Sequence, residues 1–334
     1  MKIDFVITWV DSSDLVWLTK KNKELKLIGK PMEDANGIER FRDYGTLKYL
    51  LRSIEKYASW VNKIYLVTDN QKPSWLKESL QGTKLQIIDH KEIIPKKARP
   101  TFNSNAIEMC IDAIPNLSEH FVIFNDDCLI NKETSPQDFF DDDGTPKDFR
   151  LYSAFSVASA YDQLRFNDNF ALNNMVQKNG KWPLSKKGLF SLKYPLRSNI
   201  RNLYFKVDSH GRISTHVIPH NALSFTKSNF EKAKKQWVNE VNTTIMQKFR
   251  SKQDITIFLL RGFQLENGSF SVRSPEFSKY FVLNQTEDIA KELKRQQHSL
   301  LCINDTNTPN YEHETKIIQA ALEEKFIEKS QFEK

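Results

Sequence analysis

Three short hydrophobic runs along the chain each end at carboxylate and amide side chains. The runs span residues 4–10, 63–68 and 121–124, and the polar groups that follow them are Asp11 and Asp14, Asp69-Asn70, and Asn125-Asp126-Asp127. Such runs, rich in β-branched and aromatic residues, are typical of buried strands in a parallel sheet. Because ligands of such sheets bind beyond the carboxyl ends of the strands, we expect the acidic tips to meet in one cleft. Clustered carboxylates repel one another unless a cation lies among them, so the pattern favours Mg²⁺ or Mn²⁺ and a phosphate-bearing substrate.

Helical spacing alternates with these strands in the first 133 residues. The apolar positions predict a helix over 45–58, a helix that begins near Pro73, a strand over 85–90 and a helix that opens near Ser104 or Asn105. Residues 12–43 are polar, and the pattern assigns no element to them. Strands that alternate with helices indicate βαβ units. The predicted fold class is therefore α/β, a mostly parallel Rossmann-like sheet flanked by helices, with an inserted smaller subdomain.

Residues 1–133 form the first part of this predicted core, and three further regions follow it. Residues 134–215 carry basic residues between aromatics and predict an insertion, which is either an acceptor-binding subdomain or a solvated face. Residues 216–310 return to a core pattern, with helices over 230–247, 255–263 and 286–297, the last capped by Thr286, and a strand over 300–305. Residues 311–334 predict an amphipathic helix, with docking on the body favoured over docking on a partner or a membrane.

Composition narrows the class of protein. The chain has 334 residues with 49 basic and 42 acidic side chains dispersed along it, a net charge of +7 that suits anionic ligands but is too small to indicate nucleic acid. Its three cysteines lie far apart without a CxxC pair, which favours a reducing compartment over disulfides or structural zinc. We see no signal peptide and no apolar segment long enough to span a membrane, so we expect a cytoplasmic protein. Association with the inner face of the cell membrane is left open. Oligomeric state is also left open.

Asn125-Asp126-Asp127 is the sharpest local signal in the chain. Paired acids at the end of a strand can hold a divalent cation that bridges a diphosphate, although an Asx-turn or a helix cap would use the same residues. The same theme recurs at Asp11, at Asp69 and at Asp305, and this recurrence favours the metal site. Asp4 differs because it lies at the start of its strand, where a polar edge residue is the default interpretation.

Two arginines lie where phosphate would be bound. Arg42, in Arg40-Phe41-Arg42-Asp43, precedes the helix over 45–58, and a guanidinium beside a helix N-terminus suits an anion. The alternative is a surface ion pair of Arg42 with Asp43 or Glu39. Arg250 can neutralise a developing phosphoryl charge, or it can form an ion pair with Asp254, four residues on.

Two polar loops add further candidates. Asn105 and Glu108 have the spacing of a capping box, whereas Asn103 and Ser104 are freer to bind a ligand. His216 and His220 flank Pro219, which argues against a helical zinc pair. A histidine in a loop is suited to take a proton from a hydroxyl at neutral pH. The chain has no P-loop, no dinucleotide-binding GxGxxG and no GxSxG elbow, which excludes the obvious kinase, dehydrogenase and hydrolase classes.

Together these motifs resemble the four blocks of the Stealth family of sugar-1-phosphate transferases, which includes bacterial capsular and cell-wall polysaccharide phosphotransferases and is related to the lysosomal-enzyme N-acetylglucosamine-1-phosphotransferase. Residues 3–11 are similar to the first block, and 219–220 through 249–251 and 301–305 to the third and fourth. The second block is represented by 40–43, 51–57, 67–69, 101–104 and 124–127. Two positions depart from the family pattern, since Asn105 stands where many members have His and Thr306 where a second acid is common.

The resemblance implies a fold of the nucleotide-sugar transferase type and a reaction that moves hexose-1-phosphate or N-acetylhexosamine-1-phosphate from a UDP-sugar to a polysaccharide or lipid-linked glycan. The product is a phosphodiester, and UMP leaves. A metal-dependent glycosyltransferase that releases UDP is the alternative enzyme, and a non-catalytic glycan-binding protein is the alternative from another class. The sugar, the acceptor and the linkage position stay open.

The resemblance also implies roles for single residues. Asp127, Asp126 and Asp305 are the expected metal ligands, and Asp11, Asp127, His220 and Arg250 are the expected catalytic groups, with His216 as a less certain alternative base. The donor and acceptor are expected to contact Asp4, Trp9, Arg42, Asp69, Asn103, Ser104 and Asn125. We expect Asp11, Asp127 and His220 to share one hollow.

Overall fold

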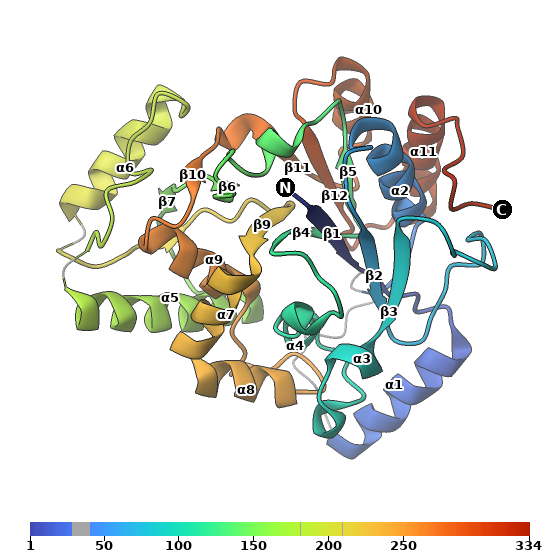
Figure 1. The fold of residues 1–334 in the computed structure, drawn as a ribbon, viewed down its shortest axis with the longest axis horizontal. Coiled ribbons are helices and arrows are strands. Elements are labelled where there is room, and N and C mark those ends of the chain that lie inside the picture. The colour runs from blue at the N-terminus through green and yellow to red at the C-terminus, as the bar shows by residue number, and fades with distance from the viewer. Residues whose placement is uncertain (29–40, 181, 209) are drawn as a thin grey trace.

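A five-stranded sheet forms the centre of the molecule (Figure 1). The computed structural model describes residues 1–28, 41–180, 182–208 and 210–334, so Glu39 and Arg40 lie outside the described residues. The strand order is β3-β2-β1-β4-β9. The strands are β1 (Ile3–Thr8), β2 (Ile64–Thr68), β3 (Leu85–Asp89), β4 (His120–Asn125) and β9 (Leu223–Thr226). The first four pair in parallel and β9 runs antiparallel to β4, which confirms the predicted fold class.

The hydrophobic runs become strands because both faces of the sheet are covered. Phe5, Val6 and Ile7 of β1 are all fully buried although they alternate between the two faces. Phe5 and Ile7 belong to one buried cluster and Val6 to a second, so each face has its own core. A strand buried on both sides reads as a continuous apolar run, and for this reason the strands could be predicted from the sequence.

Helices cover the sheet and extend beyond it. They are α1 (Leu15–Ile28), α2 (Thr46–Tyr57), α3 (His90–Ile93), α4 (Ser104–Glu108), α5 (Ala160–Asn179), α6 (Leu196–Asp208), α7 (Lys227–Gln236), α8 (Val238–Met246), α9 (Ile257–Glu266), α10 (Thr286–Arg295) and α11 (Tyr311–Lys325). Short 3₁₀ turns are η3 (Lys96–Ala98), η4 (Ile111–Ala113), η5 (Pro136–Asp138) and η6 (Pro275–Phe277).

Several predicted helices differ from the observed ones. The helix expected from Pro73 is absent, since this stretch forms a turn closed by Leu76 N–H donating to Pro73 O at 3.1 Å. The helix expected over 230–247 is broken at Trp237, whose backbone angles (φ −128°, ψ 47°) are not helical. The N-cap of α10 is Gln285 rather than Thr286, and α1 lies in the polar stretch to which no element was assigned.

A second sheet brings the last strand to the edge of the first. After Asp126 and Asp127 the chain turns into β5 (Cys128–Ile130), which pairs antiparallel with β12 (Leu300–Asn304), and β12 pairs in parallel with β11 (Ser278–Val282). Ile303 N–H donates to Asp127 O at 2.9 Å, so the end of β12 lies against the acidic turn after β4. Cys110, Cys128 and Cys302 are all free thiols, as expected.

The segment over 134–215 shares the core of the sheet. Leu172 and Met175 of α5 belong to the same buried cluster as Val6 and Tyr65. Two small sheets complete this region, β6 (Lys147–Asp148) with β10 (Ser271–Val272), and β7 (Tyr152–Ser153) with β8 (Thr215–His216). Helices α5 and α6 lie on the side away from α2 and α11 (Figure 1).

The C-terminal helix docks on the body, as the sequence favoured. Ile318 and Leu322 of α11 are fully buried in the same cluster as Phe5 and Ile7. Beyond it, Glu333 accepts two hydrogen bonds of 2.8 Å from Arg52 on α2. Within the described residues, no helix combines the length and apolar character needed to cross a membrane.

Candidate active site

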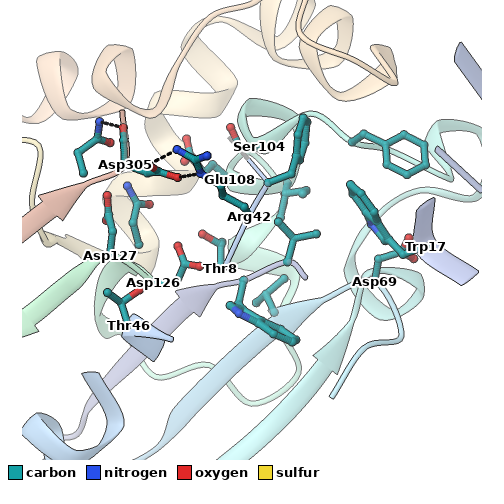
Figure 2. Close-up of a pocket in the computed structure, with 18 of the residues that line it drawn as sticks. Thr8, Trp17, Arg42, Thr46, Asp69, Ser104, Glu108, Asp126, Asp127 and Asp305 are labelled. Atoms are coloured by element: carbon teal, nitrogen blue, oxygen red, sulfur yellow. Dashed lines mark hydrogen bonds and ion pairs between the residues drawn. The ribbon is translucent and has the colours of Figure 1, made fainter. Parts of the chain in front are cut away.

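A cavity of about 570 Å³ opens at the carboxyl ends of the parallel strands (Figure 2). It lies where β1 and β4 are neighbours although β2 and β3 separate them in sequence, which is the position where open α/β sheets bind ligands. The polar tips of β1, β2, β4 and β12 all contribute to its lining, including Thr8, Asp69, Asn125 and Asp305. Side chains that are remote in sequence therefore meet in one hollow.

Most of the predicted site residues line this cavity. The structure brings together Trp9, Arg42, Asp69, Ser104, Asn125, Asp126, Asp127, Arg250 and Asp305. It leaves out of the lining Asp4, Asp11, Asn103 and His220.

Asp126 and Asp127 are adjacent acids of the cavity, and both have raised pKa values. Burial, followed by the charges of Asp127 and Asp43, raises the pKa of Asp126 well above its usual range. Burial likewise raises the pKa of Asp127 to about 6, although hydrogen bonds from thiols oppose the shift. Carboxyls that are both desolvated and crowded are stabilised as anions by a nearby cation.

Two thiols contact the carboxylate of Asp127. Cys128 Sγ lies 3.7 Å from Oδ1 of Asp127 and Cys302 Sγ lies 3.4 Å from Oδ2. The three ligand atoms lie within 4.8 Å of one another, a grouping compatible with a metal. However, the hydrogen bond with Cys128 and burial raise the pKa of Cys302 well above its usual range, so this thiol stays protonated. The thiols therefore act as hydrogen-bond donors that fix the carboxylate.

The donor set that remains fits a hard divalent cation. Asp126 and Asp127 offer carboxylate oxygens, and Asn125 and Asn304 offer amide oxygens at the same end of the cavity. Mg²⁺ and Mn²⁺ prefer oxygen ligands, whereas softer ions prefer thiolates. Asp126 and Asp127 would thus hold the ion, Asp127 with the lone pairs that its hydrogen bonds from the thiols leave available.

Asp305 has a different partner from the one expected. Arg42 donates hydrogen bonds to both carboxylate oxygens of Asp305. Its Nε donates to Oδ2, and its Nη2 donates to Oδ1 at 2.7 Å. The guanidinium also stacks on Tyr311, 3.4 Å from the ring centroid. Because both oxygens are engaged by Arg42, Asp305 is less suited to bind a metal than Asp126 and Asp127. Asp305 was not among the partners expected for Arg42; of those that were, Glu39 lies outside the described residues.

A further part of the cavity lining consists of Arg250, Ser104 and Glu108. Arg250 Nη2 donates to Ser104 Oγ at 2.7 Å. Glu108, on the same short helix as Ser104, lines the cavity, and burial raises its pKa to about 7 although Arg250 lowers it. Glu108 was interpreted from the sequence as a capping residue, but the N-cap of α4 is Asn103. Spacing alone could not find this carboxyl, because its role depends on burial.

Aromatic side chains line the end of the cavity that is remote from Asp127 (Figure 2). The ring of Trp17 lies 5.4 Å from Phe102 and 5.6 Å from Phe41, and Trp9 Nε1 donates to Asp43 at 3.0 Å. Asp69 lies at this end and pairs with Lys20 at 2.6 Å. The cavity is thus aromatic at one end and acidic at the other.

The structure corrects the position of Asp4 and Asp11. Asp4 is fully buried at the far end of β1, where it accepts hydrogen bonds of 2.7 Å from Asn62 and from the N–H of Ser118. Asp11 uses its carboxylate in a local turn and accepts from the N–H and the hydroxyl of Ser13 at 2.8 and 2.7 Å. Both side chains therefore stabilise the fold around β1 rather than line the cavity.

Asn103 and the histidines are also displaced from the predicted positions. Asn103 is fully buried, where it caps α4 and donates to Asp254 at 2.8 Å. His216 Nε2 is 2.9 Å from Glu266 Oε1 in a buried ionic cluster, and His216 does not line the cavity. His220 is exposed, with its ring 4.9 Å from Tyr280. Of the three residues expected to share one hollow, only Asp127 lines it.

Two family models match parts of the chain. Residues 1–26 match the family model of Stealth protein CR1, conserved region 1, and residues 40–148 match that of Stealth protein CR2, conserved region 2. The galactosyltransferase LgtC, solved in complex with donor and acceptor sugar analogs, aligns over 95% of both chains with a TM-score of 0.38 and 10% identity. A TM-score of 0.38 is too low to transfer any property of LgtC to this chain.

Three curated relatives match nearly the whole chain. The exopolysaccharide phosphotransferase cps2G of Lactiplantibacillus plantarum is 38% identical over 99% of this chain and 96% of its own. The capsular polysaccharide phosphotransferase WcwK of Streptococcus pneumoniae is 36% identical over 100% and 98%. The receptor polysaccharide phosphotransferase WefC of Streptococcus oralis is 37% identical over 91% and 90%. The chain is therefore a transferase enzyme that belongs to the Stealth family of bacterial phosphotransferases.

Proposed function

We propose that this enzyme transfers hexose-1-phosphate or N-acetylhexosamine-1-phosphate from a UDP-sugar to a glycan hydroxyl in capsular or cell-wall polysaccharide synthesis. The observation that carries the proposal is the cavity itself, which combines paired acids of raised pKa with the guanidinium of Arg250. Its volume of about 570 Å³ suits a ligand of nucleotide-sugar size. Relatives named as polysaccharide phosphotransferases support the reaction class.

The two ends of the cavity suit the two parts of such a donor. The aromatic end, with Trp17 and Phe102, offers ring faces on which a uracil base can stack. The acidic end, with Asp126 and Asp127, would hold Mg²⁺ or Mn²⁺, which supplies neutralisation of the diphosphate charge when bound. Arg250 would contact the phosphoryl oxygens, where charge develops as the bond to UMP breaks.

The reaction proposed is an in-line displacement at the β-phosphorus. The acceptor oxygen forms a bond to this phosphorus, the bond between the β-phosphorus and the bridging oxygen breaks, and UMP leaves with the bridging oxygen. The hydroxyl proton needs a base. Glu108 lines the cavity with a pKa of about 7 and is the first candidate. His220 is the second: although its side chain is partly exposed to solvent, desolvation of the ring, followed by the charge of Arg165, lowers its pKa.

A second hollow is available for the acceptor. This hollow of about 470 Å³ lies between α6 and η6 and includes Arg197, Arg201 and Tyr280. The nearby charges of Cys302 and Asp127 contribute to the raised pKa of Tyr280, so this ring lies near the catalytic acids as well as His220. We propose that this hollow, bounded in part by residues 134–215, takes the glycan acceptor, and that His220 lies where the acceptor hydroxyl arrives.

We also propose that the protein works in the cytoplasm. The three cysteines are all free, and Cys128 and Cys302 lie side by side without forming a disulfide. Adjacent unoxidised thiols are typical of a reducing compartment.

Product analysis tests the proposed reaction. Purified protein is incubated with Mn²⁺, a panel of UDP-sugars and a glycan acceptor, with Asp127→Asn as the inactive control. We expect UMP by chromatography and a phosphodiester signal by phosphorus NMR. Release of UDP without that signal would establish a glycosyltransferase instead, and no turnover of any donor would favour a glycan-binding protein.

A further inference from the structure

Helix α6 presents an apolar stripe to solvent. Leu196, Ile200, Leu203 and Val207 have exposed fractions of 76, 59, 50 and 75%. Steps of four, three and four residues place them on one side of a helix with 3.6 residues per turn. We call these four residues the α6 stripe. Four large aliphatic side chains exposed in one row form a contiguous patch rather than scattered surface residues.

The opposite side of α6 is fixed to the protein. Asn202 is fully buried, and its amide donates to the carbonyls of Arg150 at 2.9 Å and Leu189 at 2.8 Å. Its oxygen accepts from the N–H of Tyr152 at 3.1 Å. Asn199 adds a pair of hydrogen bonds with Ser191. These bonds orient the helix, so the stripe is held outward at the periphery of the molecule (Figure 1).

The surroundings of the stripe are apolar and basic. Phe190, Leu192 and Tyr204 add exposed fractions of 45, 106 and 62% beside it. The segment over 186–208 has one acidic residue, Asp208, against six basic ones: Lys186, Lys187, Lys193, Arg197, Arg201 and Lys206. Arg197 and Arg201 lie on the helix just beside the stripe, where their long side chains can reach past the apolar row.

We infer that the α6 stripe docks the enzyme on an anionic lipid surface. A helix with an outward apolar face flanked by Lys and Arg lies in the membrane interface, with its apolar face among the acyl chains and its cations at the headgroups. The charge of the segment complements anionic phospholipid. It disfavours a second copy of this chain, because two such segments would bring twelve like-signed side chains together.

Vesicle binding tests the inference without any substrate, so the result is independent of the proposed reaction. The whole protein is sedimented with vesicles of phosphatidylglycerol and phosphatidylcholine, and with phosphatidylcholine alone. We expect binding to the anionic vesicles that weakens as salt is raised. Replacing the four stripe residues by Ser should lower the partition coefficient by about tenfold or more. Arg197→Gln with Arg201→Gln should weaken binding to anionic vesicles only.

A matched control removes the same amount of exposed apolar surface elsewhere. Leu15, Leu27, Val238 and Ile327 have exposed fractions of 75, 72, 53 and 72%, and they lie on separate elements or apart on α1. Replacing these four by Ser should leave vesicle binding unchanged. Equal losses in the two quadruple variants would overturn the assignment to α6.

A labelled variant keeps the test valid if the stripe variant fails to fold. Leu203→Cys carrying an environment-sensitive fluorophore should shift to the blue on anionic vesicles, while the same label at Val238→Cys should not. Absence of any shift, or of wild-type binding to anionic vesicles, would overturn the inference. So would a dimer in solution that the stripe variant dissociates, because the stripe would then be a contact between copies.

Discussion

At the scale of single residues, two carboxyls in the cavity have raised pKa values and different surroundings. Asp127 accepts hydrogen bonds from Cys128 and Cys302, which hold its oxygens toward the acidic end. Burial raises the pKa of Glu108, and the charge of Arg250 opposes this shift. The carboxylate of Asp127 is therefore held in place by its hydrogen bonds, whereas the carboxyl of Glu108 can gain or lose a proton near neutral pH.

Asp127→Asn tests the first of these roles. The amide keeps the size of the side chain but removes its charge, so the fold should persist while kcat falls by about 10²–10³-fold, as for loss of other transition-state charge stabilisers. Steady-state UMP release measures the effect, and circular dichroism checks the fold. Asp11→Asn is the comparison, and it should retain most activity because Asp11 lies in a local turn. Near-normal turnover of Asp127→Asn would remove this residue from the site.

Glu108→Gln tests the second role through pH. If Glu108 is the base, turnover of the wild type rises as pH increases through about 7, the pKa of its folded-state carboxyl, and the variant loses this dependence together with most of its kcat. His220→Ala would instead leave the profile intact. A large loss in His220→Ala with little in Glu108→Gln would reverse the two assignments.

The same carboxyl makes stability depend on pH. Its pKa is raised in the folded state, so its contribution is fully present below the ordinary value of 4.5 and is lost as pH rises through about 7. The free energy of unfolding should therefore decline less between these values in Glu108→Gln than in the wild type. Urea titrations at a series of pH values measure this difference, and parallel curves would contradict the raised pKa.

At the scale of elements, a buried ionic cluster joins α9 to the segment that precedes α5. Glu266 on α9 is fully buried and accepts hydrogen bonds from Arg150 and from Tyr152, the latter at 2.9 Å. It also pairs with His216, whose Nε2 lies 2.9 Å from its Oε1. Although burial raises the pKa of Glu266, the bond from His216 and the charge of Arg150 lower it overall. The cluster thus holds the insertion against the second part of the core.

Glu266→Gln should break this connection. Arg150 would be left as a buried charge without its counterion, which costs about 3–5 kcal/mol in unfolding free energy. Urea denaturation measures the loss. Lys291→Ala is the control, because its pairs with Glu287 and Asp288 at 3.5 and 3.9 Å are exposed and such pairs contribute under about 1 kcal/mol. Equal effects of the two substitutions would show that the cluster is not stabilising.

The elements also show where sequence patterns suffice. The strands of the parallel sheet could be predicted because burial on both faces leaves continuous apolar runs, as at residues 121–124. The break between α7 and α8 could not, because the apolar period continues across Trp237 and tertiary packing ends the helix. Helix α1 escaped detection because it buries few of its side chains, with Trp17 at 3% exposure as the main anchor.

Only those residues of the site that topology brings together could be predicted from the sequence. Acids at the carboxyl ends of strands, such as Asp126, were found because topology places them together. The pairing of Arg42 with Asp305 and the burial of Glu108 depend on packing between remote segments. Family resemblance could nominate Asp4 and His220, but it did not reveal that neither side chain lines the cavity.

At the scale of the whole molecule, ligand binding should be visible as added stability. Mn²⁺ with UDP should raise the melting temperature more than either alone, because the cation relieves repulsion at Asp126 and Asp127 while the diphosphate bridges to Arg250. At about 100 times Kd the gain is about 2.7 kcal/mol, which corresponds to a shift of a few degrees. Differential scanning fluorimetry measures it. Asp127→Asn should lose the shift and the exposed control Asp142→Asn should keep it, and a shift that persists in Asp127→Asn would place the ion elsewhere.

The ion pair of Arg42 with Asp305 joins positions 263 residues apart in the chain. During synthesis, β1 to β4 leave the ribosome long before the strand that carries Asp305 exists. A nascent chain can therefore assemble most of its central sheet while one wall of the cavity is still missing. Premature termination anywhere before this last strand would therefore yield a product without that wall.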